Sequence, residues 1–132
     1  NSDVRIVFIP MPARTDGEQS NDTKFSFLNQ FQELIEEHYD DDQFKAKQVA
    51  KLMNLSESQL FRRLKSLTNQ GFTAYLRFYR LQKAKGLLEN NQELSISEIA
   101  YEVGFNDPNY FSRSFSEAFG LSPRGLRQNR KD

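Results

Sequence analysis

The feature that most constrains this fold is an internal repeat, in which residues 49–64 and 99–115 carry nearly the same pattern about fifty residues apart. Apolar, small and basic residues recur in the same order, with one extra turn residue in the second copy. The matching pairs are Val49 with Ile99, Ala50 with Ala100, Met53 with Val103, Leu55 with Phe105, Leu60 with Phe111, Arg62 with Arg113 and Leu64 with Phe115. A repeat identifies the unit from which a fold is built, so we predict two copies of one small structure.

Local signals indicate that the unit is a helix, a tight turn and a second helix. Ser56 with Gln59 and Ser95 with Glu98 have the spacing of capping boxes, in which two side chains satisfy the first N–H groups of a helix. Helices are therefore predicted to begin directly after Ser56 and Ser95.

The turn inside each copy is predicted from Asn54 and Gly104, which stand where a helix ends in a left-handed residue. In the second copy Asp107 is suited to cap the next helix and Pro108 to begin it, because the first helical position needs no N–H donor. That helix is expected to run to Gly120.

Each second helix has one apolar and one polar face. Phe111, Phe115 and Phe119 recur at four-residue spacing, which is the pattern of a helix facing a core. The helix of the first copy is expected to bury its leucines, Leu60, Leu64 and Leu67. Polar and basic side chains are left on the opposite faces.

The whole chain of 132 residues is predicted to be all-α, with about seven helices. We expect a short irregular leader over residues 1–23 with a possible strand at 4–9, and a first helix-turn-helix subdomain over 24–70 that opens with a helix from 24 to 39. A connecting helix over 71–91 then leads to a second helix-turn-helix subdomain over 92–132. The connecting helix, predicted from about Phe72 to Asn90, would be roughly 28 Å long at about 1.5 Å per residue.

Charge is unevenly distributed although the net charge is zero. Residues 1–55 hold six basic against ten acidic side chains, residues 56–95 hold seven against three, and residues 96–132 hold five of each. Phosphate binding requires a local excess of Lys and Arg. The middle segment meets this requirement.

Several function classes are disfavoured by composition. Cysteine is absent and His38 is the only histidine, so we expect no disulfide, metal site or cofactor. The longest apolar run, residues 7–12, is too short to cross a membrane, and a cytoplasmic fragment without membrane contact is expected. We find no phosphate-binding glycine loop and no nucleophile with a plausible base, so no catalytic residues and no enzyme activity are predicted.

The second copy gives the chain a family resemblance. Residues 96–115, ISEIAYEVGFNDPNYFSRSF, followed by Gly120-Leu121-Ser122-Pro123, resemble the DNA-binding domain of the AraC family of bacterial transcription regulators. The likeness covers roughly residues 25–127, and residues 55–68 are most similar to the output domains of hybrid two-component regulators. The resemblance implies double-stranded DNA as partner, read by two recognition helices in adjacent major-groove segments. It also places Arg80 within the fold, bracing the connecting helix.

Candidate DNA contacts follow from the outward positions and from the resemblance. An arginine can bond guanine O6 and N7, so Arg62, with Ser58 one turn earlier, is the expected base reader of the first copy. The other basic side chains of that helix and its glutamine are expected at phosphates, and its phenylalanine against a thymine methyl group. The candidates are Ser58, Gln59, Phe61, Arg62, Arg63 and Lys65, together with Pro108, Asn109, Ser112 and Arg113, which the resemblance implies.

Further partners and one alternative function remain open at this point. A regulator of this type would contact RNA polymerase and would dimerise through regions upstream of this fragment. The alternative is a helical protein-interaction adaptor derived from a helix-turn-helix fold. Its corresponding helix faces would be apolar or acidic, whereas the faces here are polar and basic.

Overall fold

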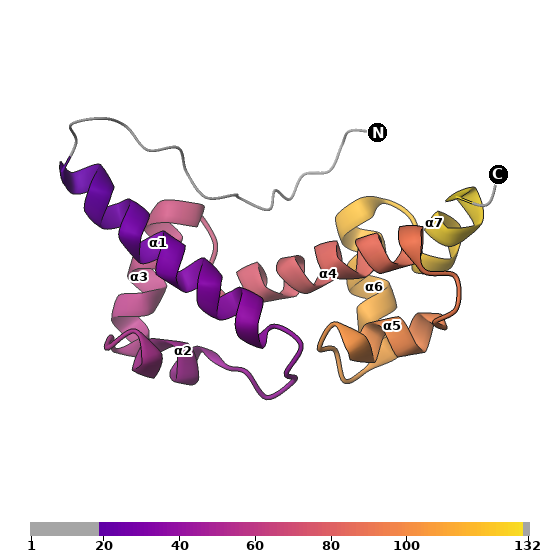
Figure 1. Cartoon of the computed structure of the whole chain (residues 1–132), viewed down its shortest axis with the longest axis horizontal. Helices are drawn as coiled ribbons and strands as arrows, with labels where there is room; N and C mark the ends of the chain where they lie inside the picture. Colours follow the sequence, from indigo (N-terminus) through magenta and orange to yellow (C-terminus); the bar gives the residue numbers. More distant parts are fainter. Residues whose placement is uncertain (1–18, 131–132) are drawn as a thin grey trace. The chain divides into compact units, whose positions relative to one another are not determined.

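The computed structural model describes residues 19–130, which form seven helices and no strand (Figure 1). The helices are α1 (Gln19–His38), α2 (Ala46–Leu52), α3 (Glu57–Thr68), α4 (Phe72–Asn90), α5 (Ile96–Glu102), α6 (Pro108–Phe119) and α7 (Pro123–Arg130). The predicted all-α class is therefore confirmed. The strand expected at residues 4–9 lies outside the described residues.

The first helix begins earlier than the sequence indicated. We expected it to start near Lys24, but α1 starts at Gln19, so the predicted leader boundary falls inside a helix. Residues 19–23 are all polar, so no apolar period marks them as helical. Once the amphipathic part of a helix has formed, each added residue extends it without a new nucleation cost.

Both predicted capping boxes are present. The Ser56 hydroxyl accepts a hydrogen bond from the Gln59 N–H at 3.0 Å, and the Ser56 N–H donates to the Gln59 side chain at 2.9 Å. Ser95 and Glu98 make the same pair at 3.0 and 2.8 Å. These bonds fix the first turns of α3 and α5 at the predicted residues.

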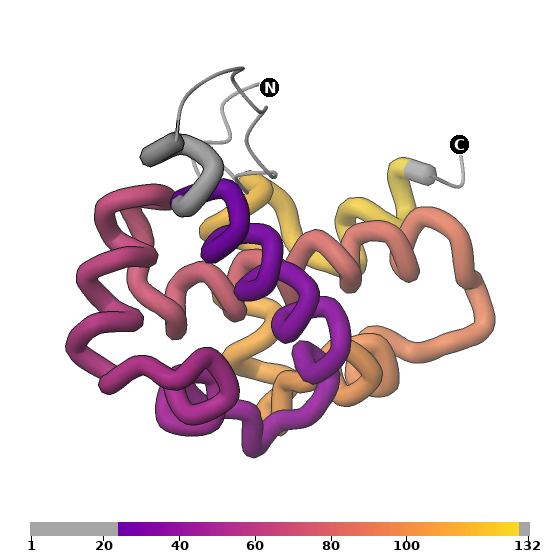
Figure 2. The backbone as a smooth tube through the Cα atoms, turned by 60° about the vertical axis from the view of Figure 1, so that its left-hand side comes forward, coloured from indigo at the N-terminus to yellow at the C-terminus, as the bar shows by residue number. Residues whose placement is uncertain are grey.

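The turns of the two helix-turn-helix copies also have the predicted backbone. Asn54 and Gly104 have φ angles of 59° and 102°, in the region that L side chains rarely adopt. The Asp107 carboxylate accepts from the Asn109 N–H at 3.0 Å, which caps α6, and Gly120 ends this helix with φ 82°. The backbone therefore turns sharply before α3 and before α6 (Figure 2).

The described residues divide into two compact units, and α4 contributes to both. The N-terminal unit contains residues 19–38 and 43–76, and the C-terminal unit contains residues 39–42 and 77–130. The connecting helix is thus shared between the units at Leu76 and Arg77, with its first residues packed in the N-terminal unit.

The core of the N-terminal unit is built from α1, α2, α3 and the start of α4. Phe31 is fully buried and meets the Tyr75 ring edge-on, with 5.1 Å between ring centres. The Gln32 side chain donates a hydrogen bond to the Tyr75 hydroxyl at 2.9 Å. Burial raises the pKa of Tyr75. Leu60 and Leu64 of α3 are buried as predicted, while Leu67 is half-buried.

In the C-terminal unit the predicted phenylalanine stripe of α6 forms the core. Phe111 and Phe115 are fully buried. Phe119 is half-buried and stacks on Phe78 of α4, with 6.2 Å between ring centres. Phe105, from the turn, packs edge-on against Phe111. Each recognition-like helix is thus held by its apolar face.

Two arginines anchor loops of the C-terminal unit. Arg80 donates to the carbonyl oxygens of Tyr39 and Asp41 at 2.7 and 2.9 Å, so its predicted bracing role within the fold is confirmed. Burial lowers its pKa, against the opposing effect of the acidic residues at 40–42. Arg127 of α7 donates to the carbonyl oxygens of Leu94 and Asn91, both at 2.7 Å.

Candidate nucleic-acid interface

The outward face of α3 carries three of the predicted contact residues. Leu60 and Leu64 face the core, and with 3.6 residues per turn the opposite side of the helix presents Ser58, Arg62 and Lys65. All three are exposed. Among the side chains that the structure describes, no carboxylate lies within ion-pair distance of Arg62. The guanidinium is therefore available to an external acceptor.

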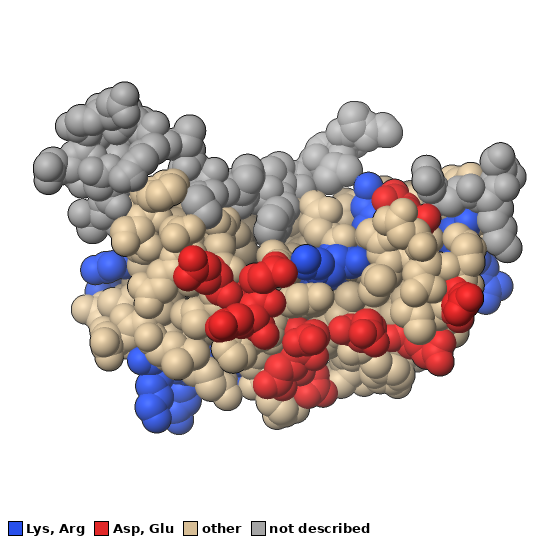
Figure 3. Space-filling view, viewed as in Figure 1, with Lys and Arg blue, Asp and Glu red and all other residues tan. Residues whose placement is uncertain are grey.

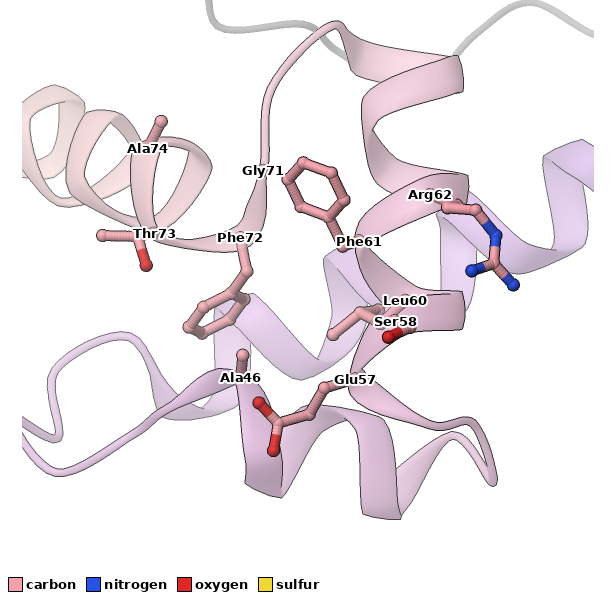
Figure 4. A pocket seen from close by; sticks show the side chains of 10 residues that line it. All are labelled: Ala46, Glu57, Ser58, Leu60, Phe61, Arg62, Gly71, Phe72, Thr73 and Ala74. Carbon is pink, nitrogen blue, oxygen red and sulfur yellow. The ribbon is translucent and has the colours of Figure 1, made fainter.

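The remaining candidates of α3 lie on its flanks. Phe61 is 54% exposed and lies beside Gly71, in a hollow of about 530 Å³ that the start of α4 also lines. Figure 4 shows the Phe61 ring pointing toward Gly71 while Arg62 extends to the other side of α3. A β-carbon at Gly71 would lie only 3.1 Å from the Phe61 ring, so glycine permits this close contact.

Arg63 occupies the opposite flank of α3, where it meets α1. Its guanidinium carbon lies 5.4 Å from the centre of the Phe27 ring, within the range of a cation–π contact. Gln59, the sixth candidate on this helix, is exposed but its side-chain oxygen is used in the capping box. The structure therefore separates the candidates of α3 into an outward ridge and two flanks.

The outward face of α6 carries fewer charges. Asn109 and Arg113 are exposed, and Arg113 lies over the ring of Tyr110 at 5.8 Å. Pro108 and Ser112 are half-buried at the edge of the face. Tyr110 is 41% exposed on α6 but was not among the predicted DNA contacts. The repeat aligns it with Gln59, and its exposure in the structure adds it to the outward face of α6.

The repeat places equivalent side chains on the two outward faces. Ser58, Arg62 and Lys65 of α3 correspond to Asn109, Arg113 and Ser116 of α6. Glu57 and three basic residues give α3 a net charge of +2, whereas Arg113 and Glu117 give α6 a net charge of zero. The two faces thus share a central arginine but differ in their attraction for phosphate.

Acidic side chains gather elsewhere. On the face shown in Figure 3 they lie over the later part of α1 and also over the segment after it and over α5, and Glu33, Glu36 and Glu37 of α1 are exposed. The segment that follows adds Asp40, Asp41 and Asp42. Within the N-terminal unit, the basic side chains of α3 favour an anionic partner, whereas Glu33, Glu36 and Glu37 of α1 disfavour one.

Between residues 19 and 130 there is no group of three or more His, Cys, Asp or Glu side chains that could hold a metal ion. None of the helices in this range is long and apolar enough to span a bilayer.

Comparisons with known proteins identify a helix-turn-helix family and several transcription regulators that resemble this chain. A helix-turn-helix domain family matches residues 49–129. The HTH-type transcriptional activator RhaS of Enterobacter sp. (strain 638) is 36% identical over 125 residues, which cover 95% of this chain and 43% of that protein. The chain spans 39 to 43% of the length of such curated relatives.

Solved structures also resemble the chain. The C-terminal domain of the two-component response regulator YesN from Fusobacterium nucleatum matches with a TM-score of 0.72 and 35% identity, covering 77% of this chain and 98% of that domain. The DNA-binding domain of AdpA, a global transcriptional factor solved in complex with a target DNA, matches with a TM-score of 0.73 and 28% identity. That match covers 79% of this chain and 92% of the AdpA domain.

Proposed function

The chain belongs to the AraC family of helix-turn-helix, DNA-binding transcription regulators, and we propose that it reads double-stranded DNA through α3 and α6 as two recognition helices. The family is one of DNA-binding domains and not of enzymes. The observation that carries the proposal is the equivalence of the two outward faces, each with an exposed arginine opposite a buried apolar stripe. Each helix would enter one major-groove segment, and the two segments would be adjacent.

On α3 the proposed chemistry is base reading by Ser58, Arg62 and Phe61 and phosphate contact by Arg63 and Lys65. Arg62 is placed to donate two hydrogen bonds to guanine O6 and N7, and Ser58 to bond a neighbouring base edge. Lys65 and Arg63 would bind phosphates, which position the helix without specifying sequence. Phe61, exposed beside Gly71, would meet a thymine methyl group.

On α6 the equivalent contacts would be weaker. Asn109 has the amide geometry to bond adenine N6 and N7, and Arg113 the geometry to bond guanine. Pro108 and Ser112 would lie at the edge of the contact. Because α6 carries no net charge, we infer that it contributes more to sequence preference than to affinity.

We also propose that the chain is the output domain of a larger bacterial regulator. Its relatives are longer, and the YesN and AraT domains that it resembles belong to response regulators. Dimerisation would then depend on other regions of the regulator, and activation on contact with RNA polymerase. A domain with this task would act in the cytoplasm, where the bacterial chromosome lies.

The adaptor alternative is less well supported. A protein-interaction surface on α3 or α6 would be expected to carry an apolar patch at its centre. The centres of these faces are instead Arg62 and Arg113, with serine, lysine or asparagine beside them.

Selection of bound sequences from random duplexes by the purified chain tests the proposal directly. We expect enrichment of a motif with two conserved segments about 10 base pairs apart, one helical turn of DNA. Enrichment of a single segment would refute reading by two helices. Recovery of random sequences would refute sequence-specific binding as a whole.

A further inference from the structure

We infer that the DNA interface extends to α1 through a basic groove beside α3, and that this groove holds the sugar–phosphate backbone of one strand. The inference rests on the proposed function. The groove has a volume of about 270 Å³ and lies between α1 and α3 in the N-terminal unit. Its lining residues are Lys24, Phe27, Arg62, Arg63, Ser66 and Leu67, and we call it the α1 groove.

The charge of the α1 groove is complementary to a nucleic-acid strand. Three of its six lining side chains are basic, none is acidic, and Lys24, Arg62 and Arg63 are all exposed. Among the side chains that the structure describes, none of the three forms an ion pair. Glu33, Glu36 and Glu37 of α1 line a different surface with Asn29 and Gln32. A strand in the α1 groove would therefore meet donors without displacing an internal partner.

The floor of the α1 groove orients one of these donors. Phe27 is 7% exposed and Leu67 is half-buried, so the floor is apolar and suits the carbon atoms of a deoxyribose ring. The Arg63 guanidinium lies over Phe27 at 5.4 Å. This contact restricts the side chain, so that less rotamer entropy is lost when it binds a phosphate.

The α1 groove is continuous with the base-reading ridge because both include Arg62. Arg62 also lines the Phe61 hollow on the other flank of α3, so the ridge is bordered by a depression on each side. A helix in a major groove has one DNA strand on each flank. The depression toward α1 is the one with Lys24, Arg63 and the hydroxyl of Ser66 at its rim.

Lys24 is the one lining residue of this groove for which we newly propose a DNA contact on α1. It lies on α1, before residues 49–129 that the helix-turn-helix family matches, and it is far from α3 in the sequence. Figure 1 shows α1 lying against α3, and this packing brings Lys24 into the same groove as Arg63. We assign Lys24 a phosphate of its own on the strand nearest α1, next to the phosphate that Arg63 contacts.

The test compares Lys24→Gln with Lys85→Gln as a control of equal charge change. Lys85 lies on α4, and its ammonium group is 3.6 Å from Glu89, so its charge is already compensated. Each retained phosphate contact contributes about 0.9 to the slope of log affinity against log salt. Lys24→Gln should lower the magnitude of this slope by about that amount on specific and random duplexes alike. The ratio of wild-type to variant affinity should then shrink about threefold to fourfold between about 50 and 200 mM salt.

Duplexes with a neutral methylphosphonate at single positions locate the contact. One substitution beside the segment read by α3 should weaken the wild-type chain and have no effect on Lys24→Gln, while Lys85→Gln should respond as the wild type does. A salt slope for Lys24→Gln equal to that of Lys85→Gln would overturn the inference and leave the α1 groove to an acidic peptide. The inference would also be overturned if the salt slope were reduced but every methylphosphonate position weakened Lys24→Gln as much as it weakens the wild type. Lys24 would then act at long range and not through one phosphate.

The outcome is distinguishable from failure of the proposed function. If the wild-type chain bound all duplexes equally, sequence-specific reading would be refuted. The salt dependence of the affinity of Lys24→Gln for random DNA would still show whether the α1 groove binds a phosphate. If the wild-type chain bound no duplex, both would be overturned.

Discussion

Gly104→Ala is expected to destabilise the C-terminal unit by about 2.5 to 5 kcal/mol. Gly104 has φ 102°, and a β-carbon there would clash with the Tyr39 carbonyl oxygen and lie 2.6 Å from Arg80 Nε. The left-handed backbone costs an L residue about 1 to 2 kcal/mol. The larger part comes from Arg80, whose 2.7 Å bond to the Tyr39 oxygen must lengthen. A hydrogen bond to a charged group contributes about 1.5 to 3 kcal/mol.

Asn54→Ala is the matched control, since Asn54 holds the equivalent turn position in the first copy with φ 59°. Its side chain already has a β-carbon, so the change affects only backbone preference and should cost about 1 kcal/mol. The free energy of unfolding of both variants can be measured by urea titration followed by circular dichroism. If Gly104→Ala lost no more stability than Asn54→Ala, the close approach of Tyr39 and Arg80 to Gly104 would be the wrong explanation for this glycine.

Two further predictions concern single side chains. Arg62→Ala should cost roughly 1 to 3 kcal/mol of binding free energy on the preferred duplex and relax preference at one base pair, whereas Lys65→Ala should weaken all duplexes similarly; equal losses on specific and random DNA for both would show that neither reads a base. Arg127→Ala should lower the free energy of unfolding by about 2 to 4 kcal/mol, because the carbonyls of Leu94 and Asn91 lose a charged donor. Arg127→Lys should recover less than half of this loss, since an ammonium group lacks the fork that holds both oxygens; full recovery would contradict the role given to the guanidinium.

Features set by neighbouring residues were predictable from the sequence. The capping boxes at Ser56 and Ser95 and the left-handed turns at Asn54 and Gly104 each depend on side chains or backbone within a few residues. The start of α1 was missed because a polar segment carries no period, although it extends a helix that the following residues already specify.

Features that depend on packing between distant segments were not predictable in detail. Arg127 bonds carbonyls that lie 33 and 36 residues before it, and no local pattern marks such partners. The outward residues of α3 were identified because its buried leucines fix its orientation. The division into ridge, Phe61 hollow and α1 groove depends on where Gly71 and Phe27 lie, which only the fold determines.

The central claim, that two helices of unequal charge read adjacent segments of one duplex, is tested most directly by footprinting the wild-type, Arg62→Ala and Arg113→Ala chains on the selected site. We predict strong protection over the segment read by α3 and weaker protection about 10 base pairs away. Arg62→Ala should weaken protection of the strong segment and lower the affinity more than Arg113→Ala does, because α3 carries the net positive charge. Arg113→Ala should remove only the weak one. Loss of the strong segment on Arg113→Ala, with Arg62→Ala nearly silent, would contradict the assignment of α3 as the dominant reader.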